Sequence, residues 1–230
     1  MDAVALIGLW AALFLITHLG ISSAAIRSRL AAAIGEQPYR GVYSIVSLAT
    51  FVPLVIVFAH HKHAGPMLWN LRAVPPLRWL AWLMMLAAFV LFVAGLAGPN
   101  PSSMAGRLGG FSARGVLKLT RHPSFTAFAL FGFAHMMMNG FVGDLLFFAT
   151  FPALGILGGL HQDRRKLRDL GDSYRGFVVR TSFFPGAALW DGRQRWTGAD
   201  TPWLAIGIGV AVTVLIVMLH PTLFGGHPIP

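Results

Sequence analysis

The sequence predicts an all-α integral membrane protein, folded as a bundle of six transmembrane helices. Hydrophobic residues make up 56% of the 230 residues and charged residues only 11%, and the mean hydropathy is +0.66. Soluble domains carry about 25% charged residues. Crossing a hydrocarbon layer of about 30 Å takes roughly 17–25 helical residues. Six apolar stretches reach this length, at 3–25, 41–59, 77–97, 123–139, 141–160 and 202–220.

The first stretch, 3–25, is expected to be a retained helix and not a cleaved signal. Asp2 is the only charge before Arg27, so the basic region that opens a signal peptide is missing. The second stretch contains Pro53 and the fifth contains Pro152. Each proline is expected to kink its helix and to free a carbonyl that a neighbouring group must satisfy.

The fourth and fifth stretches are separated only by Asn139 and Gly140, which predicts a tight helical hairpin. The longest polar stretch, 161–201, follows. Its first part, from His161 to Tyr174, is expected to continue the fifth helix until Gly171 ends it. The sixth stretch completes a single membrane domain over residues 1–230.

The positions of the 18 Lys and Arg residues test the six-helix interpretation independently of hydropathy. The first, third and fifth loops carry three, four and eight of them, and the second loop carries the other three, a split of 15 against 3. Because cytoplasmic loops are enriched in Lys and Arg, both termini are predicted on the outer, periplasmic side of a bacterial inner membrane. The predicted cytoplasmic set is Arg27, Arg29, Arg40, Arg107, Arg114, Lys118, Arg121, Arg164, Arg165, Lys166, Arg168, Arg175, Arg180, Arg193 and Arg195.

The formal net charge of +10 and the absence of cysteine narrow the chemistry. In a membrane protein the basic loops are expected to contact anionic lipid at the cytoplasmic face, and not nucleic acid. The lack of cysteine excludes disulfides, iron–sulfur clusters and a thiolate-ligated haem. Histidine is therefore the strong ligand that remains for a transition metal.

Two histidines, His18 and His135, lie inside apolar stretches. An ionisable side chain in hydrocarbon is costly and marks a candidate functional site, and a neutral imidazole is the commonest protein ligand for a metal or haem iron. The alternative is a packing role, with the ring hydrogen-bonded to a helix backbone or, for His18, to Ser22 or Ser23. Because the two histidines come from different helices, they favour a haem held within the bundle.

Polar residues at the cytoplasmic ends of the helices form a second candidate group. Arg121 and His122 precede the fourth stretch, and Arg164 and Arg165 follow the fifth. Guanidinium groups match carboxylates in a planar geometry with two hydrogen bonds. Arg121, Arg164 and Arg165 are therefore candidates for holding a haem propionate or a substrate carboxylate, with anchoring to anionic lipid as the alternative. His122 would face the headgroups or a polar cofactor tail.

Three histidines, His60, His61 and His63, follow the second stretch on the predicted outer side. A solvated cluster is the simplest interpretation, because hydration costs little there.

Together these residues form an ordered set that resembles the NnrU family, which is related to the plant and cyanobacterial zeta-carotene isomerases. The resemblance extends from His18 to Gln194, over most of the chain. Its pieces are His18 to Ala25, Pro38-Tyr39-Arg40, His61 with Lys62 and Gly65, Leu68-Trp69, Thr120-Arg121-His122-Pro123, Ala134-His135, Asp163-Arg164-Arg165, Arg180-Thr181-Ser182 with Pro185, and Asp191-Gly192-Arg193-Gln194.

The resemblance implies a protein that binds b-type haem and, in the isomerase branch, uses reduced haem to convert the central cis double bond of a carotenoid precursor to trans. Family histidines associated with haem and activity match His18, His61 and His135. The implied partners are haem, an apolar polyene or another lipid-like substrate, and an electron donor of unknown identity. Five phenylalanines are candidate lining for an apolar slot, with ordinary packing as the alternative for most of them: Phe125, Phe128, Phe131, Phe147 and Phe148.

The depth of these histidines in the membrane does not decide which two of them would be the axial ligands of the haem iron. At about 1.5 Å rise per residue, His18 lies roughly 22 Å below the outer end of its helix and His135 only about 6 Å below the outer end of its own. His61 is closer in depth to His135, which makes these two the alternative pair. The family resemblance favours His18 with His135.

Two further function classes stay open. The Arg-His-Pro start, followed by acidic residues and a Gly-x-x-Tyr stretch, also resembles membrane methyltransferases that use S-adenosylmethionine. The adjacent Glu pair of those enzymes is missing here, and His161 and Asp163 stand near its place. The other class is a non-enzymatic accessory protein of denitrification or respiration, linked to haem or nitric oxide.

Overall fold

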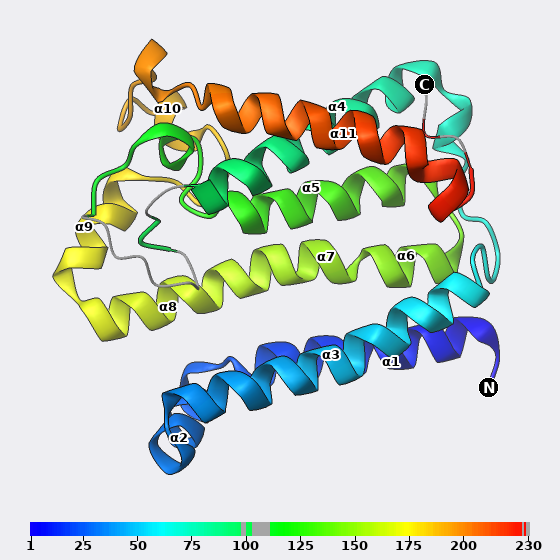
Figure 1. The fold of residues 1–230 in the computed structure, drawn as a ribbon, viewed down its shortest axis with the longest axis horizontal. Coiled ribbons are helices and arrows are strands. Elements are labelled where there is room, and N and C mark those ends of the chain that lie inside the picture. Colours follow the sequence, from blue (N-terminus) through cyan, green and yellow to red (C-terminus); the bar gives the residue numbers. More distant parts are fainter. Residues whose placement is uncertain (98–99, 103–110, 227, 229–230) are drawn as a thin grey trace.

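The computed structural model describes residues 1–97, 100–102, 111–226 and 228, and their regular structure is helical apart from one isolated bridge between Met67 and Phe141. Six helical segments run along the molecule, each antiparallel to the next in the chain (Figure 1). They are α1 (Ala3–Ile21), α3 (Glu36–His60), α4 (Pro75–Ala97), α5 (Pro123–Met138), the segment from α6 to α8 (Val142–Leu170) and α11 (Trp203–Leu223). Each of the six predicted stretches is therefore confirmed as helical.

Five of these segments are long and apolar enough to cross a membrane, whereas α5 is apolar but has only 16 residues. The count of six crossings and the outer location of the termini stay predictions. Arg107, one of the predicted cytoplasmic arginines, lies outside the described residues.

The shorter elements are α2 (Ala24–Ile34), η1 (Leu71–Ala73), η2 (Gly115–Lys118), α9 (Asp172–Arg180), α10 (Ala187–Trp190) and η4 (Gly198–Asp200).

The first helix ends earlier than the sequence predicts, and α2 occupies part of the first predicted loop. Ser22 donates its hydroxyl to the carbonyl of Leu19, and Ser23 takes an extended backbone that turns the chain. Serine side chains compete with helical hydrogen bonds in this way and favour helix boundaries. An ion pair of 2.6 Å between Arg27 and Glu36 then connects α2 to the start of α3.

The predicted hairpin between α5 and α6 is confirmed, and it depends on Gly140. The Gly140 carbonyl accepts a hydrogen bond of 2.8 Å from the backbone N–H of Leu68. A Cβ at position 140 would lie 2.0 Å from the carbonyl oxygen of Trp69. Only glycine allows the loop after α3 to approach the turn this closely.

The segment from α6 to α8 is irregular around Pro152. It divides into α6 (Val142–Phe148), α7 (Thr150–Ala153), the π-helical turn η3 (Leu154–Gly158) and α8 (Gly159–Leu170). Because proline has no N–H, the Phe148 carbonyl loses its partner within the helix. Gly132 of α5 packs against both the Pro152 ring and this carbonyl. Pro53, by contrast, lies inside one continuous helix, α3. Beyond α8, the chain turns at Gly171, whose φ is +55°, as the sequence predicts.

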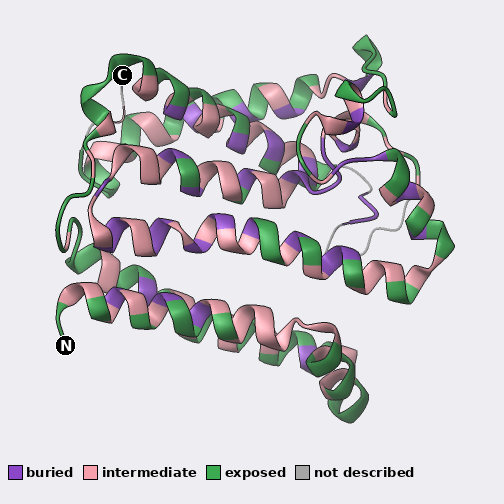
Figure 2. Ribbon diagram, turned by 180° about the vertical axis from the view of Figure 1, so that it is seen from behind, coloured by how far each residue is buried: buried purple, intermediate pink, exposed green. Residues whose placement is uncertain are grey.

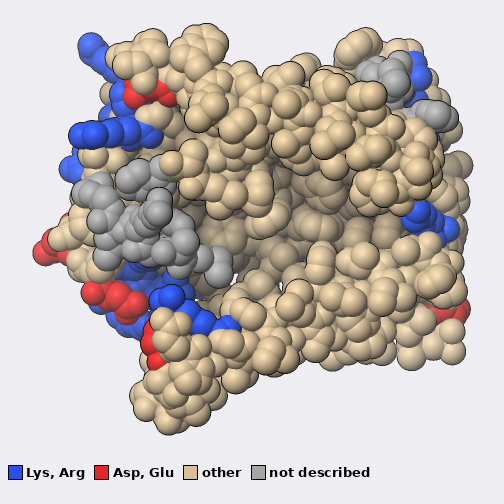
Figure 3. All heavy atoms as spheres, viewed as in Figure 1, with Lys and Arg blue, Asp and Glu red and all other residues tan. Residues whose placement is uncertain are grey.

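The surface of the bundle is apolar between two polar ends. In Figure 2 the buried residues lie mostly on the sides of the helices that face each other, and exposed residues cover the outside. Large apolar side chains such as Ile45, Leu83 and Leu204 are exposed along the long helices, as expected for contact with lipid. Figure 3 shows Lys and Arg gathered mainly at the end formed by α2, α8 and α9. The chain begins at the opposite end, where α11 also terminates (Figure 1).

The polar segment before α11 is folded against the start of the α5 region. The Asp200 carboxylate accepts hydrogen bonds from Lys118 Nζ at 2.7 Å and from Thr197 Oγ1 at 2.6 Å. These hydrogen bonds hold the pKa of Asp200 well below its usual range. The contact fixes η4 to η2 and so positions the first turn of α11.

The close packing of α5 on η3 can be tested with Gly155→Ala. The added Cβ would lie 2.4 Å from the carbonyl oxygen of Phe125, a backbone atom that cannot move aside on its own. Overpacking of this kind costs about 1–3 kcal/mol of unfolding free energy, so we expect a lower Tm in detergent. Gly207→Ala on α11 is the control, because nothing lies within 4 Å of its added Cβ. Equal Tm values for the two variants would contradict this packing.

Candidate functional site

A cavity of about 380 Å³ lies between the α1–α3 pair on one side and α5, η3 and α8 on the other. Its volume is in the usual range for small-molecule sites, roughly 300–1,000 Å³. Its walls are mainly aromatic and aliphatic, with a few polar side chains among them. The lining residues are Phe14, His18, Leu19, Ser22, Tyr43, Ser47, Leu48, Phe51, Phe125, Phe128, Phe151, Leu154, Gly158, His161, Gln162 and Arg165.

A second cavity, of about 660 Å³, lies between the end of α4 and the start of α11. Among the described residues that line it, Arg114 is the only ionisable one and none is a histidine. The smaller cavity is therefore the stronger candidate for chemistry.

His18 lies in the last turn of α1 and is held by α3. Its Nδ1 lies 3.0 Å from the hydroxyl of Ser47, and its Nε2 lies 2.6 Å from the hydroxyl of Tyr43. These two partners are four residues apart and share one face of α3. The ring orientation of His18 is thus set by the neighbouring helix and not by the helix that carries it.

One face of the η3–α8 segment supplies the opposite wall. Gly158, His161, Gln162 and Arg165 line the cavity, with the spacing i, i+3, i+4 and i+7 of a single helical face. Gln162 accepts a hydrogen bond from Arg165 and donates one of 2.8 Å to the carbonyl of Ser102. His161 was not predicted as a site residue from the sequence. Its spacing from Arg165 along one helical face was the signal that could have indicated it.

The other side of α8 carries Asp163, which is the centre of a buried charge network. Arg121 donates to its Oδ2 from Nε at 2.8 Å and from Nη2 at 2.7 Å. His122 Nε2 lies 2.8 Å from its Oδ1, and the Tyr174 hydroxyl donates to the same oxygen at 2.7 Å. Arg121 and His122 are thus engaged with Asp163, and neither lines the cavity. The contact of Arg121 and His122 with an anionic cofactor group therefore stays a prediction.

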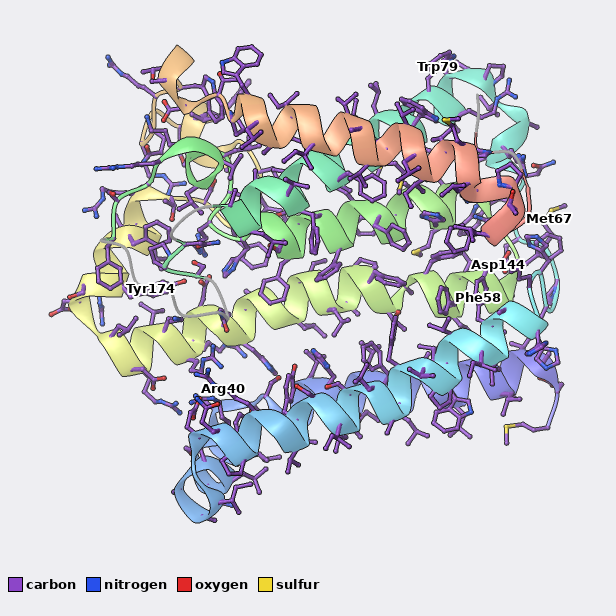
Figure 4. The ribbon with its side chains drawn as sticks, viewed as in Figure 1. Arg40, Phe58, Met67, Trp79, Asp144 and Tyr174 are labelled. Atoms are coloured by element: carbon purple, nitrogen blue, oxygen red, sulfur yellow. The ribbon has the colours of Figure 1, made fainter. Side chains whose placement is uncertain are left out.

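Tyr174 connects this network to α9 and to the segment at 100–102. Its hydroxyl lies 2.8 Å from that of Ser102, and its side chain is fully buried. Burial, together with the nearby Asp163 carboxylate, raises the pKa of Tyr174 above its usual value. The phenol therefore stays protonated and donates to Asp163. Figure 4 shows Tyr174 at the α8–α9 end of the bundle.

His135 lies apart from His18. Each residue is in the last turn of its helix, and α1 and α5 run in opposite directions, so the two residues lie toward opposite ends of the bundle (Figure 1). The Nδ1 of His135 lies 2.9 Å from the carbonyl of Phe131, and its ring stacks on Phe148 with 4.6 Å between centroids. The structure thus does not bring His18 and His135 into one cavity, and the axial role of His135 stays a prediction.

The aromatic residues predicted to line a slot divide into two groups. Phe125 and Phe128 line the cavity. Phe131 and Phe148 instead pack on the ring of His135. Phe147 packs on Phe148 and stacks on Phe58 of α3 at 3.9 Å between centroids. The packing alternative therefore holds for three of the five.

The histidines after α3 have different roles. His60 and His61 are exposed at the end of α3. His63 contacts Asp144 of α6, with 2.7 Å between Nδ1 and Oδ2 and a backbone hydrogen bond of 2.9 Å to Oδ1. Asp144 is fully buried, and it was missed as a partner even though it is the only charged residue in 141–160. This contact lies at the end of the bundle opposite to Tyr174 (Figure 4).

The remaining arginines also differ. Arg164 is exposed, whereas Arg165 lines the cavity. Within the described part of the chain, no group of three or more His, Asp and Glu residues is placed to hold a metal ion by itself. His18 and His161 are the two imidazoles among the described residues that line the smaller cavity.

The fold and the site define a helical, multi-pass membrane protein with a largely apolar cavity that contains two histidines. The chain belongs to the NnrU family: the family model described as NnrU protein matches residues 6–228.

Two curated relatives are both named 15-cis-zeta-carotene isomerase, chloroplastic. The one from Arabidopsis thaliana is 26% identical over 233 residues, which cover 93% of this chain and 59% of the relative. The one from Zea mays is 26% identical over 195 residues, which cover 80% of this chain and 50% of the relative. The chain thus spans between half and three fifths of the length of these relatives. No solved structure matches it.

The buried network can be tested with Asp163→Asn. This variant leaves Arg121 and His122 buried without a carboxylate, and breaking a buried ion pair in this way costs about 3–5 kcal/mol. We expect a large fall in Tm in detergent. Asp169→Asn is the control, because Asp169 lies on the same helix with its side chain 40% exposed, in an ion pair with Arg168. Such exposed pairs contribute little, so similar losses in the two variants would argue against a buried network.

Proposed function

We propose that the protein isomerises a cis double bond of a linear carotenoid precursor, with b-type haem as its cofactor. The observation that carries this proposal is the largely apolar cavity that contains His18, because a polyene needs an apolar slot and haem needs an imidazole ligand. The names of the two relatives support a 15-cis-zeta-carotene-like substrate.

The residues around the cavity fit a haem. Ser47 holds the Nδ1 of His18, which is the kind of contact that orients a metal-ligating histidine. The Nε2 contacts the neutral hydroxyl of Tyr43, a partner that an iron would replace. Arg165 supplies positive charge for a propionate. When bound, haem would supply a redox-active iron that exchanges electron density with the polyene and so lowers the order of its double bond.

The protein's own residues would bind the polyene and exclude water. Phe14, Phe51, Phe125 and Phe128 contribute aromatic surface on several sides of the cavity. Leu48 and Phe128 line the cavity and are also exposed on the outside of the bundle, with relative exposures of 59% and 36%. The cavity is therefore accessible from the side, where lipid would surround the helices. An apolar substrate would reach it from the bilayer without crossing water.

We also propose that all six helical segments cross the membrane and that the end carrying α2, α8 and α9 is cytoplasmic. The Lys and Arg side chains at this end support the assignment, since they would contact anionic lipid (Figure 3). At about 1.5 Å per residue, α5 is only about 24 Å long. Because α5 packs between α4 and the α7–η3 segment, its neighbours would cover much of its surface. A bacterial inner membrane stays the proposed location.

The isomerase activity can be tested in cells that accumulate 15-cis-zeta-carotene. Expression of the chain should convert this isomer to the 15-trans form, measured as the ratio of the two isomers by liquid chromatography. His18→Ala should reduce the conversion at least about tenfold, because loss of an iron ligand costs more than the roughly 10- to 100-fold loss of affinity caused by removing an outer-shell partner. His60→Ala, at the exposed end of α3, is the control and should keep the activity.

Two results would contradict the proposal in different ways. An unchanged isomer ratio with a fully haem-loaded protein would favour the accessory role. A purified protein that stays colourless and takes up no haem on reconstitution would remove the cofactor and favour the methyltransferase alternative.

A further inference from the structure

His161 is a partly buried histidine that has no hydrogen-bond partner among the described residues. Its Nδ1 is inaccessible to solvent, and within the same part of the chain neither ring nitrogen is hydrogen-bonded. Three other histidines in or next to the helices each have at least one nitrogen with a partner. His18 has partners at both nitrogens, His135 contacts the Phe131 carbonyl, and His122 contacts Asp163 through Nε2, although its own Nδ1 is also buried without a partner. The Nε2 of His161 has no partner in the described part of the chain and is not sealed from its surroundings, so this nitrogen is available to a ligand.

The position of His161 indicates what that ligand is. His161 lines the same cavity as His18, and the two rings come from different sides of it, from α8 and from α1. Two imidazoles from separate helices are the donor set of a six-coordinate b-type haem. The same α8 face carries Arg165 one turn further on, where its hydrogen bond to Gln162 occupies one of its five N–H groups.

We propose that His161 is the second axial ligand of the haem iron, opposite His18. The inference rests on the proposed haem-dependent function and adds a residue to it. His18 and His135 lie at different depths along the bundle, whereas His18 and His161 line one cavity. His135 then has a structural role, through its contacts with Phe131 and Phe148.

The test uses the full-length protein purified in detergent and loaded with haem. The wild type should show the low-spin ferric spectrum of a haem with two imidazole ligands, by optical absorption and electron paramagnetic resonance. His161→Gly should shift this spectrum toward high spin and weaken haem binding by at least about tenfold. Free imidazole added to His161→Gly should restore the low-spin spectrum, because it fills the vacant position. This rescue would not occur if the substitution had only disturbed the fold.

A second variant tests the ligand without emptying its position. His161→Met replaces an imidazole by a thioether, and thioether ligation raises the reduction potential of a haem. We therefore expect a higher midpoint potential for the haem bound to this variant, measured by redox titration. His135→Gly is the matched control, and it should keep both the low-spin spectrum and the potential of the wild type.

The possible results separate the inference from the proposed function. A wild-type protein that binds no haem would overturn both. A haem-loaded wild type together with a His161→Gly variant that keeps the low-spin spectrum, or a His161→Met variant with an unchanged potential, would overturn the inference alone. Loss of the low-spin spectrum in His135→Gly with its retention in His161→Gly would do the same and would assign the second position to His135.

Discussion

The ion pair between Arg121 and Asp163 is the interaction on which the rest of the site depends. Asp163 lies on a helix that continues directly from an apolar segment, so its charge must be satisfied inside the protein. Its partners all lie on one side of α8, and this fixes the rotation of that helix about its axis. As a result, the positions one or two residues away, His161, Gln162 and Arg165, face the cavity on the other side.

The opposite wall is positioned by a second set of contacts. Ser47 and Tyr43 of α3 hold the ring of His18, so α1 and α3 act as one unit at the cavity. At the far end, this pair is attached to the bundle by the stacking of Phe58 on Phe147, and the loop after α3 is attached to α6 by the contact of His63 with Asp144. The close approaches at Gly132 and Gly155 hold α5 against the α7–η3 segment. The cavity therefore lies between two units that are each well packed.

Most of the helices could be predicted because hydrophobic length and charge bias are local properties of the chain. The hairpin at Gly140 and the end of α8 at Gly171 followed from turn residues in the same way. The helix α2 was not predicted, because the interpretation depended on apolar stretches long enough to cross a membrane and α2 has only 11 residues, none of them buried. Asp144 and His161 were visible as polar residues in or next to apolar stretches. Asp144 pairs with His63, and His161 lines the same cavity as His18, and both of these neighbours come from distant parts of the chain.

The sequence by itself determined that this is a helical membrane protein with one strongly basic end and histidines at membrane depth. These properties follow from composition and from the spacing of residues along one helix. Only the tertiary structure decided which histidines share a cavity, because that depends on the direction and rotation of helices that are far apart in the chain. Antiparallel packing separates His18 from His135, and the Asp163 network turns His161 toward the cavity that His18 lines.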